Sequence, residues 1–125
     1  MAEPVPRRFV LLQHEIHGAR HFDFMIEDGG TLATWQLDRS PTLLKPGEEW
    51  PCLRLAQHRA AYLTYEGPVS GDRGAVTRIA AGICDALAAT ATRWTFALHS
   101  PALAGRFELR HLTGSAWKLK MFAAA

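Results

Sequence analysis

Residues 13–27, "QHEIHGARHFDFMIE", carry three histidines, one aspartate and two glutamates, the densest group of potential metal ligands in the chain. If residues 21–27 form a β-strand, alternate side chains face opposite sides, so His21 and Asp23 share one face. An imidazole and a carboxylate in that arrangement can chelate a divalent cation. His14, at the end of the preceding apolar run, would supply a third ligand. Two histidines and one carboxylate leave coordination positions open, as a catalytic metal requires.

The same pattern has a purely structural explanation. A His-x-Asp pair is also what a half-buried strand presents to solvent, and short motifs of this kind often match by chance. Further along the chain, His58 and Tyr62 are a second pair of side chains that could do chemistry. They also have a structural explanation, because a loop histidine and a core tyrosine need no functional cause. The residues alone therefore leave both explanations open.

The elements that would position these side chains are short and strand-like. Runs rich in aromatic and branched residues, separated by Gly and Pro, predict strands at residues 8–14, 21–27, 31–37, 60–66, 93–99, 106–112 and 116–122. The Gly-Gly pair at 29–30 predicts a hairpin between the second and third of them. Residues 75–92 are ambiguous, since their alanines favour a helix while Gly82 and the threonines weaken it. Together the pattern predicts a mainly β fold, a small closed antiparallel barrel of about eight strands with short helices or turns.

The whole chain fits one small domain. Its 125 residues predict a single domain over 1–125, with an N-terminal arm over 1–8 and a frayed end over 123–125. No apolar run reaches the roughly 18–20 residues that span a bilayer, and no secretion signal is recognisable, so we expect a cytoplasmic location. The two cysteines predict ordinary reduced thiols. A net charge of +2 permits a polyanionic partner without requiring one.

Five segments in a fixed order resemble one known family, the 3′-phosphoesterase domain associated with bacterial DNA ligase D, which also occurs as small stand-alone proteins. The resemblance extends from about Phe9 to Phe122. The segments are "FVLLQHE" (9–15), "HFDFMIE" (21–27), "TWQLDRSP" (34–41), "HRAAYLTYEG" (58–67), and "LAGRFELRHL" with "WKLKMF" near the end.

The resemblance implies an eight-stranded barrel that holds Mn²⁺ and the 3′ end of a nucleic acid, and it favours a strand over residues 75–87. Such enzymes remove a 3′-terminal ribonucleoside and the remaining 3′-phosphate. Their partners would be DNA or RNA/DNA 3′ ends, with a DNA ligase and a polymerase acting in trans during end joining. By position, the implied roles are metal ligation by His14, His21 and Asp23, catalytic phosphate contact by His58 and Tyr62, and further phosphate binding by Arg39 and Arg20.

Departures from the family pattern concern the phosphate more than the metal. Met25 stands where the family has an arginine, so a guanidinium able to clamp a phosphate through two hydrogen bonds is missing. The turn between His14 and His21 is one residue longer. Arg54, Arg59 and Arg73 lie near His58 in sequence and would bind further phosphates, or simply maintain solubility.

Two functions follow from these observations. The first is a metal-dependent 3′-end-processing phosphoesterase in DNA repair. The alternative is a catalytically impaired, metal-dependent module that binds nucleic-acid ends. A third interpretation, a small metal-binding barrel acting on another phosphoester, would show metal dependence without a preference for nucleic-acid ends.

Overall fold

The computed structural model describes residues 5–123. Two short 3-10 turns, η1 (Pro41–Leu43) and η2 (Ala60–Leu63), interrupt a chain made almost entirely of strands. The strands are β1 (Val5–Ile16), β2 (Ala19–Asp28), β3 (Thr31–Leu37), β4 (Glu49–Arg59), β5 (Gly67–Pro68), β6 (Ala75–Ala89), β7 (Arg93–His99), β8 (Gly105–Thr113) and β9 (Ala116–Met121).

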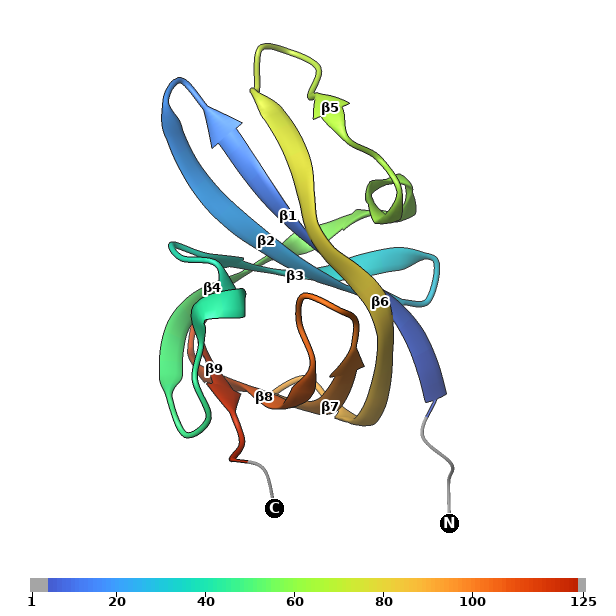
Figure 1. Cartoon of the computed structure of the whole chain (residues 1–125), viewed down its shortest axis with the longest axis vertical. Helices are drawn as coiled ribbons and strands as arrows, with labels where there is room; N and C mark the ends of the chain where they lie inside the picture. The colour runs from blue at the N-terminus through green and yellow to red at the C-terminus, as the bar shows by residue number, and fades with distance from the viewer. Residues whose placement is uncertain (1–4, 124–125) are drawn as a thin grey trace.

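Eight of these strands close into an antiparallel barrel. Their order is β1-β2-β3-β4-β9-β8-β7-β6, and β6 pairs with β1 to complete the ring. The two-residue β5 adds to β6 beyond the end of β7. The long strands β1, β2 and β6 extend past the ring, and β5 and η2 lie beside this extension (Figure 1). The predicted closed barrel is confirmed.

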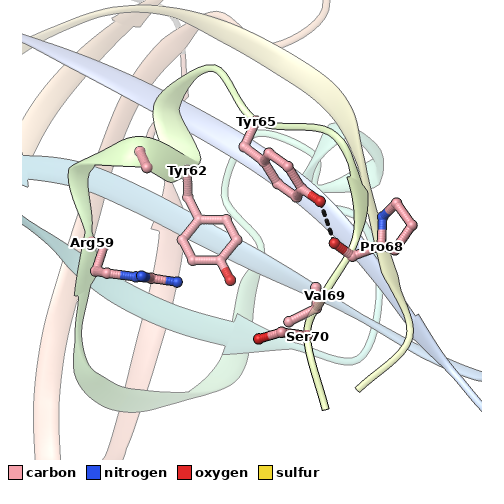
Figure 2. Close-up of a pocket in the computed structure, with 7 residues that line it drawn as sticks. Arg59, Tyr62, Tyr65, Pro68, Val69 and Ser70 are labelled. Carbon is pink, nitrogen blue, oxygen red and sulfur yellow. Dashed lines mark hydrogen bonds between the residues drawn. The ribbon is translucent and has the colours of Figure 1, made fainter. Parts of the chain in front are cut away.

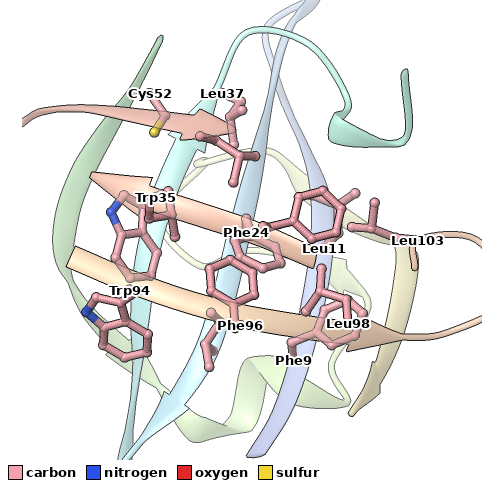
Figure 3. Packing of buried hydrophobic residues seen from close by; sticks show 14 of the residues in the cluster. Phe9, Leu11, Phe24, Trp35, Leu37, Cys52, Trp94, Phe96, Leu98 and Leu103 are labelled. Atoms are coloured by element: carbon pink, nitrogen blue, oxygen red, sulfur yellow. The ribbon is translucent and has the colours of Figure 1, made fainter. Parts of the chain in front are cut away.

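Aromatic residues fill the barrel interior (Figure 3). Trp35 is fully buried, and its ring meets those of Trp94 and Trp117 edge-on, with centroids 5.2 and 5.6 Å away. Phe24 packs between Phe9 and Phe96 at 5.9 and 5.8 Å. Edge-to-face and offset contacts of this kind are the favoured geometry for aromatic pairs. The interior is therefore a packed core, so a ligand would have to bind on another surface of the barrel.

A second apolar cluster lies on the outer face of β1, β2, β3 and β6. Its members alternate in sequence with the interior residues, so their side chains point away from the barrel. Leu63 from η2 covers them and is 7% exposed, and Tyr62 and Val69 pack at its margin. We call this the outer cluster, formed by Val10, Leu12, Met25, Leu32, Leu63 and Val76. Burial on both faces explains why residues 9–12 are apolar without alternation.

The structure corrects two predicted elements. Residues 60–66 do not form a strand: the chain turns into η2 at Ala60, and β4, which is not among the predicted strands, occupies residues 49–59. The consecutive alanines of η2 have weak strand preference, and the tight turn brings Leu63 over the outer cluster. Residues 75–89 form β6, as the family resemblance favoured. At Gly82 a Cβ atom would lie 2.2 Å from the carbonyl oxygen of His99, so only glycine fits there without a backbone shift.

The predicted N-terminal arm over 1–8 is wrong for residues 5–8, which form the start of β1 and pair with β6. The Arg8 guanidinium forms an ion pair with Glu27 at 2.9 Å, which helps hold this end on β2. Residues 1–4 lie outside the described part of the chain. Of the predicted frayed end over 123–125, Ala123 follows β9 without regular structure, and residues 124–125 are not described.

Both cysteines are buried and unpaired. Burial raises the pKa of the Cys52 and Cys84 thiols to about 12, so both stay protonated and unreactive at neutral pH. Over residues 5–123, no helix has the length and apolar character needed to cross a membrane.

Candidate metal centre

The structure brings the three predicted metal ligands together. His14 in β1 pairs directly with His21 in β2, and Asp23 lies two residues further on the same face. One ligand atom from each residue can be chosen so that all three lie within 4.8 Å of one another. The two imidazole rings meet edge-on with centroids 4.9 Å apart. The site therefore lies on the outer face, at the end of the outer cluster nearest the β1–β2 turn.

The turn between β1 and β2 fixes this register. It contains only His17 and Gly18, which both have positive φ angles, 50° and 82°. Two central residues with positive φ are the feature of the tight hairpin turn that matches the twist of antiparallel strands. Because Ile16 pairs with Ala19 across it, His14 lies opposite His21. The turn that is one residue longer than the family pattern thus keeps both histidines at one site.

A backbone carbonyl orients His14. Its Nε2 lies 2.6 Å from the carbonyl oxygen of Arg73, which can only accept, so Nε2 carries the proton and donates. In the neutral ring Nδ1 then has a free lone pair, and this atom lies 3.9 Å from Oδ2 of Asp23. Metal-binding histidines commonly donate their second nitrogen to a carbonyl in this way.

Gly74 allows the Arg73 carbonyl to come this close. Its φ is +77°, and a Cβ atom would lie 1.8 Å from the carbonyl oxygen of Glu15 in β1. Any other residue would push the segment away from the strand. The backbone contact that orients His14 therefore depends on a glycine two residues before the buried Val76.

Asp23 is a buried carboxylate with an unsatisfied oxygen. The residue is 3% exposed, and Oδ1 accepts no hydrogen bond from the described residues, although Nε2 of His21 lies 3.3 Å away. Burial raises the pKa of Asp23, and the nearby imidazoles of His21, His58 and His14 oppose that rise. Buried polar atoms without partners are rare and mark a missing ligand or a functional group. An unsatisfied carboxylate oxygen beside two imidazoles fits a divalent cation.

A cavity of about 90 Å³ opens beside these ligands. Its polar side comprises His14, Asp23, His58, Tyr62 and Arg73. Its apolar side comprises Leu12, Met25, Val69 and Val76, which largely belong to the outer cluster. One side of the cavity is thus polar and the other side is apolar.

His58 and Tyr62, the predicted catalytic residues, both line this cavity and lie next to each other. Their ring centroids are 6.0 Å apart, at 62°. Nδ1 of His58 donates to the carbonyl oxygen of Ala56 at 2.9 Å, which fixes the ring and leaves Nε2 free. His58 is the penultimate residue of β4 and Tyr62 belongs to η2, so the sharp bend after β4 directs both side chains to one place.

The two predicted phosphate-binding arginines are not part of the cavity. Arg20 precedes His21 by one residue, so strand alternation turns its side chain to the opposite face. The Arg39 guanidinium stacks on the Trp50 ring, 3.9 Å from the centroid, in a separate depression. Neither arginine lies in the cavity wall, and the phosphate-binding roles of both stay predictions.

Arg73 is the arginine that the structure places in the cavity wall instead. It lies in the loop between β5 and β6, and its guanidinium bonds the carbonyl and hydroxyl oxygens of Ser70 at 2.7 and 3.0 Å. The sequence indicated it only as one of three arginines near His58. Its place could not be read from spacing, because the loop has no periodicity.

Comparisons with known proteins do not assign the chain. No protein-family model matches it, and no curated protein has a significantly similar sequence. The resemblance to the 3′-phosphoesterase domain therefore depends on the five sequence segments alone.

Proposed function

We propose that the chain is a metal-dependent phosphoesterase that processes the 3′ ends of DNA or of RNA/DNA hybrids, removing a terminal ribonucleoside, a 3′-phosphate, or both. The observation that supports this most strongly is the unsatisfied Asp23 carboxylate beside two histidines, in a cavity that also contains His58 and Tyr62. A metal site with open positions and an adjacent acid–base pair is the equipment that phosphoester hydrolysis requires. A DNA ligase and a polymerase acting in trans would use the resulting end.

The metal would be held by His14, His21 and Asp23, and the family resemblance implies Mn²⁺. When bound, the cation would neutralise charge on the phosphate and lower the pKa of a coordinated water. The carbonyl of Arg73 keeps His14 in the tautomer that presents Nδ1. The outer cluster excludes bulk water from one side, which strengthens electrostatic interactions inside the cavity.

His58 and Tyr62 would act on the phosphate from the opposite side. The Nδ1 bond of His58 to the carbonyl of Ala56 leaves Nε2 free to carry a proton to the leaving oxygen. An imidazole is suited to that role near neutral pH. The Tyr62 hydroxyl bonds no residue within the described range, so it is available to donate to a phosphate oxygen.

Met25 supports a second candidate, a module that binds ends without cleaving them. It is 1% exposed and lies in the cavity wall, where its thioether cannot donate a hydrogen bond to a phosphate. Arg73 would compensate only if its guanidinium left Ser70. Loss of a charge-stabilising contact typically lowers phosphoryl-transfer rates by a factor on the order of 10² to 10⁴.

One experiment separates the two functions. The purified protein is incubated with Mn²⁺ and a labelled primer–template that ends in one 3′-terminal ribonucleotide, beside an Asp23→Ala control, and the products are resolved on a denaturing gel. Phosphoesterase activity predicts a shorter strand ending in phosphate or hydroxyl, absent with the control. An intact primer that still shows a metal-dependent, salt-sensitive gel shift would favour the binding module. If the protein shows no cleavage and no gel shift, both functions are excluded.

A further inference from the structure

A second, larger pocket adjoins the metal cavity. Its volume is about 270 Å³, and Tyr62 and Val69 line both spaces. Figure 2 shows Arg59 extending toward Tyr62 on one side, with Val69 and Ser70 below and Tyr65 across the pocket. A molecule with its phosphate beside His58 would therefore have its adjacent group at the mouth of this pocket.

The walls of this pocket are aromatic. The chain has two tyrosines, and both line it, with ring centroids 6.0 Å apart at 85°. The Tyr65 hydroxyl donates to the carbonyl oxygen of Pro68, which holds that ring against the end of β5. Tyr65 is nonetheless 40% exposed, so part of its face is open to a ligand.

Arg59 adds an unengaged guanidinium. The residue is exposed, and its side chain forms no ion pair or hydrogen bond with residues 5–123. Arg8, Arg78, Arg93 and Arg110, by contrast, all pair with carboxylates. Aromatic rings and arginine planes are the surfaces on which proteins stack unpaired nucleobases, with little preference among bases.

We infer that this pocket binds the base of the 3′-terminal nucleoside whose 5′-phosphate lies in the metal cavity. The inference rests on the proposed function and specifies which side of the phosphate is recognised. The volume falls just below the roughly 300–1,000 Å³ of drug-sized ligand sites, so it suits one nucleoside and not a continuing strand. A site for a single unit is what recognition of a chain end requires.

The test uses small ligands that isolate each part of the substrate. Isothermal titration with Mn²⁺ present compares adenosine 5′-monophosphate, adenosine 3′-monophosphate, ribose 5-phosphate and inorganic phosphate. We expect the 5′-monophosphate to bind about 10-fold more tightly than ribose 5-phosphate, because only it has a base to stack. Arg59→Ala and Tyr65→Leu should each remove most of this advantage and leave inorganic phosphate affinity unchanged. Arg106→Ala, which removes an equal charge from an exposed position in β8, is the matched control.

Different results would contradict the base pocket, the terminal assignment and the proposed function. Equal binding of the 5′-monophosphate and ribose 5-phosphate would overturn the base pocket. Tighter binding of the 3′-monophosphate would overturn the terminal assignment, because the pocket would then hold the preceding nucleoside. If no phosphate compound binds, the proposed function fails, and free adenosine decides the pocket separately: binding that Arg59→Ala weakens supports it, and no binding overturns it. Should Tyr65→Leu not fold, Arg59→Ala alone carries the comparison.

Discussion

The two faces of β1 and β2 are built from adjacent residues but satisfy different requirements. Inward, Phe9, Leu11 and Phe24 enter an aromatic core in which every side chain is packed. Outward, the outer cluster gives way within two residues to His14 and Asp23, where a buried carboxylate oxygen has no hydrogen-bond partner. The interior face is arranged for stability, although Nε1 of the buried Trp35 also lacks a hydrogen-bond partner there. The outer face retains an unpaired carboxylate oxygen, which costs more to bury than an indole N–H and is consistent with a functional role.

The outer cluster still contributes to the site. Met25 and Leu12 lie directly beside Asp23 and His14 in the cavity, and Leu63 of η2 covers them. This apolar surround is what desolvates the Asp23 carboxylate and raises its pKa. The outer cluster therefore positions the candidate ligands and shields them from water, and its removal should affect binding as well as folding.

The largest effect should come from the interior face. Phe24→Ala removes a side chain that is 1% exposed and packs on two other phenyl rings. We expect it to lower the free energy of unfolding by about 3–5 kcal/mol, from lost burial and the cavity left behind. Urea denaturation measures this. Wherever the variant remains folded, its Mn²⁺ affinity should match the wild type; a parallel loss of affinity would show that the two faces are not separable.

Gly74→Ala should come next and affect both stability and binding. The added Cβ collides with the Glu15 carbonyl and strains a positive-φ residue, at an expected loss of about 1–3 kcal/mol. The displaced Arg73 carbonyl should release His14 and weaken metal binding roughly 10–100-fold. Gly114→Ala is the control, because its φ is also positive at +53° but its Cβ meets nothing within 4 Å. Equal metal affinities for the two variants would contradict the role given to the carbonyl.

Asp23→Asn should act in opposite directions on stability and binding. Without metal, it removes an unsatisfied buried carboxylate and should raise the free energy of unfolding by about 1 kcal/mol. With Mn²⁺, it should lose the stabilisation that the wild type gains from the ligand. Thermal unfolding with and without Mn²⁺ measures both effects. A metal-free variant less stable than the wild type would mean that the carboxylate is satisfied in a way the geometry does not reveal.

The smallest effect should come from Arg39→Ala. Its guanidinium lies over Trp50 and outside the metal cavity, so we expect a loss below about 1 kcal/mol from the exposed cation–π contact. Mn²⁺ and phosphate affinities should not change. A clear fall in phosphate affinity on titration would support the role that the sequence resemblance suggested.

Local pattern was enough to predict the division between the two faces. The alternation of Phe22, Asp23 and Phe24 correctly separated the two core residues from Asp23, which lies on the opposite face. The His14–His21 pairing followed from neighbouring runs joined by a short turn. Both inferences depend only on the two-residue repeat of a strand.

The sequence could not reveal contacts between segments that are far apart in the chain and meet only in the folded protein. The contact between Gly74 and Glu15 joins residues 59 positions apart, and the glycine appears in sequence as an ordinary loop breaker. The place of Arg73 follows from that contact. The error over residues 60–66 has a similar origin, because Tyr62 and Leu63 resemble strand residues until the outer cluster gives them another surface to cover.

The most direct test of the metal centre is a calorimetric titration of Mn²⁺ into the wild type, His14→Ala, Asp23→Ala and His99→Ala. His99 is the matched control, because it also pairs with a carboxylate, Asp85, at 2.9 Å, but on an exposed part of β7. We expect one Mn²⁺ site per chain, lost in His14→Ala and Asp23→Ala and unchanged in His99→Ala. Binding that survives both His14→Ala and Asp23→Ala, or no binding to the wild type, would contradict this expectation.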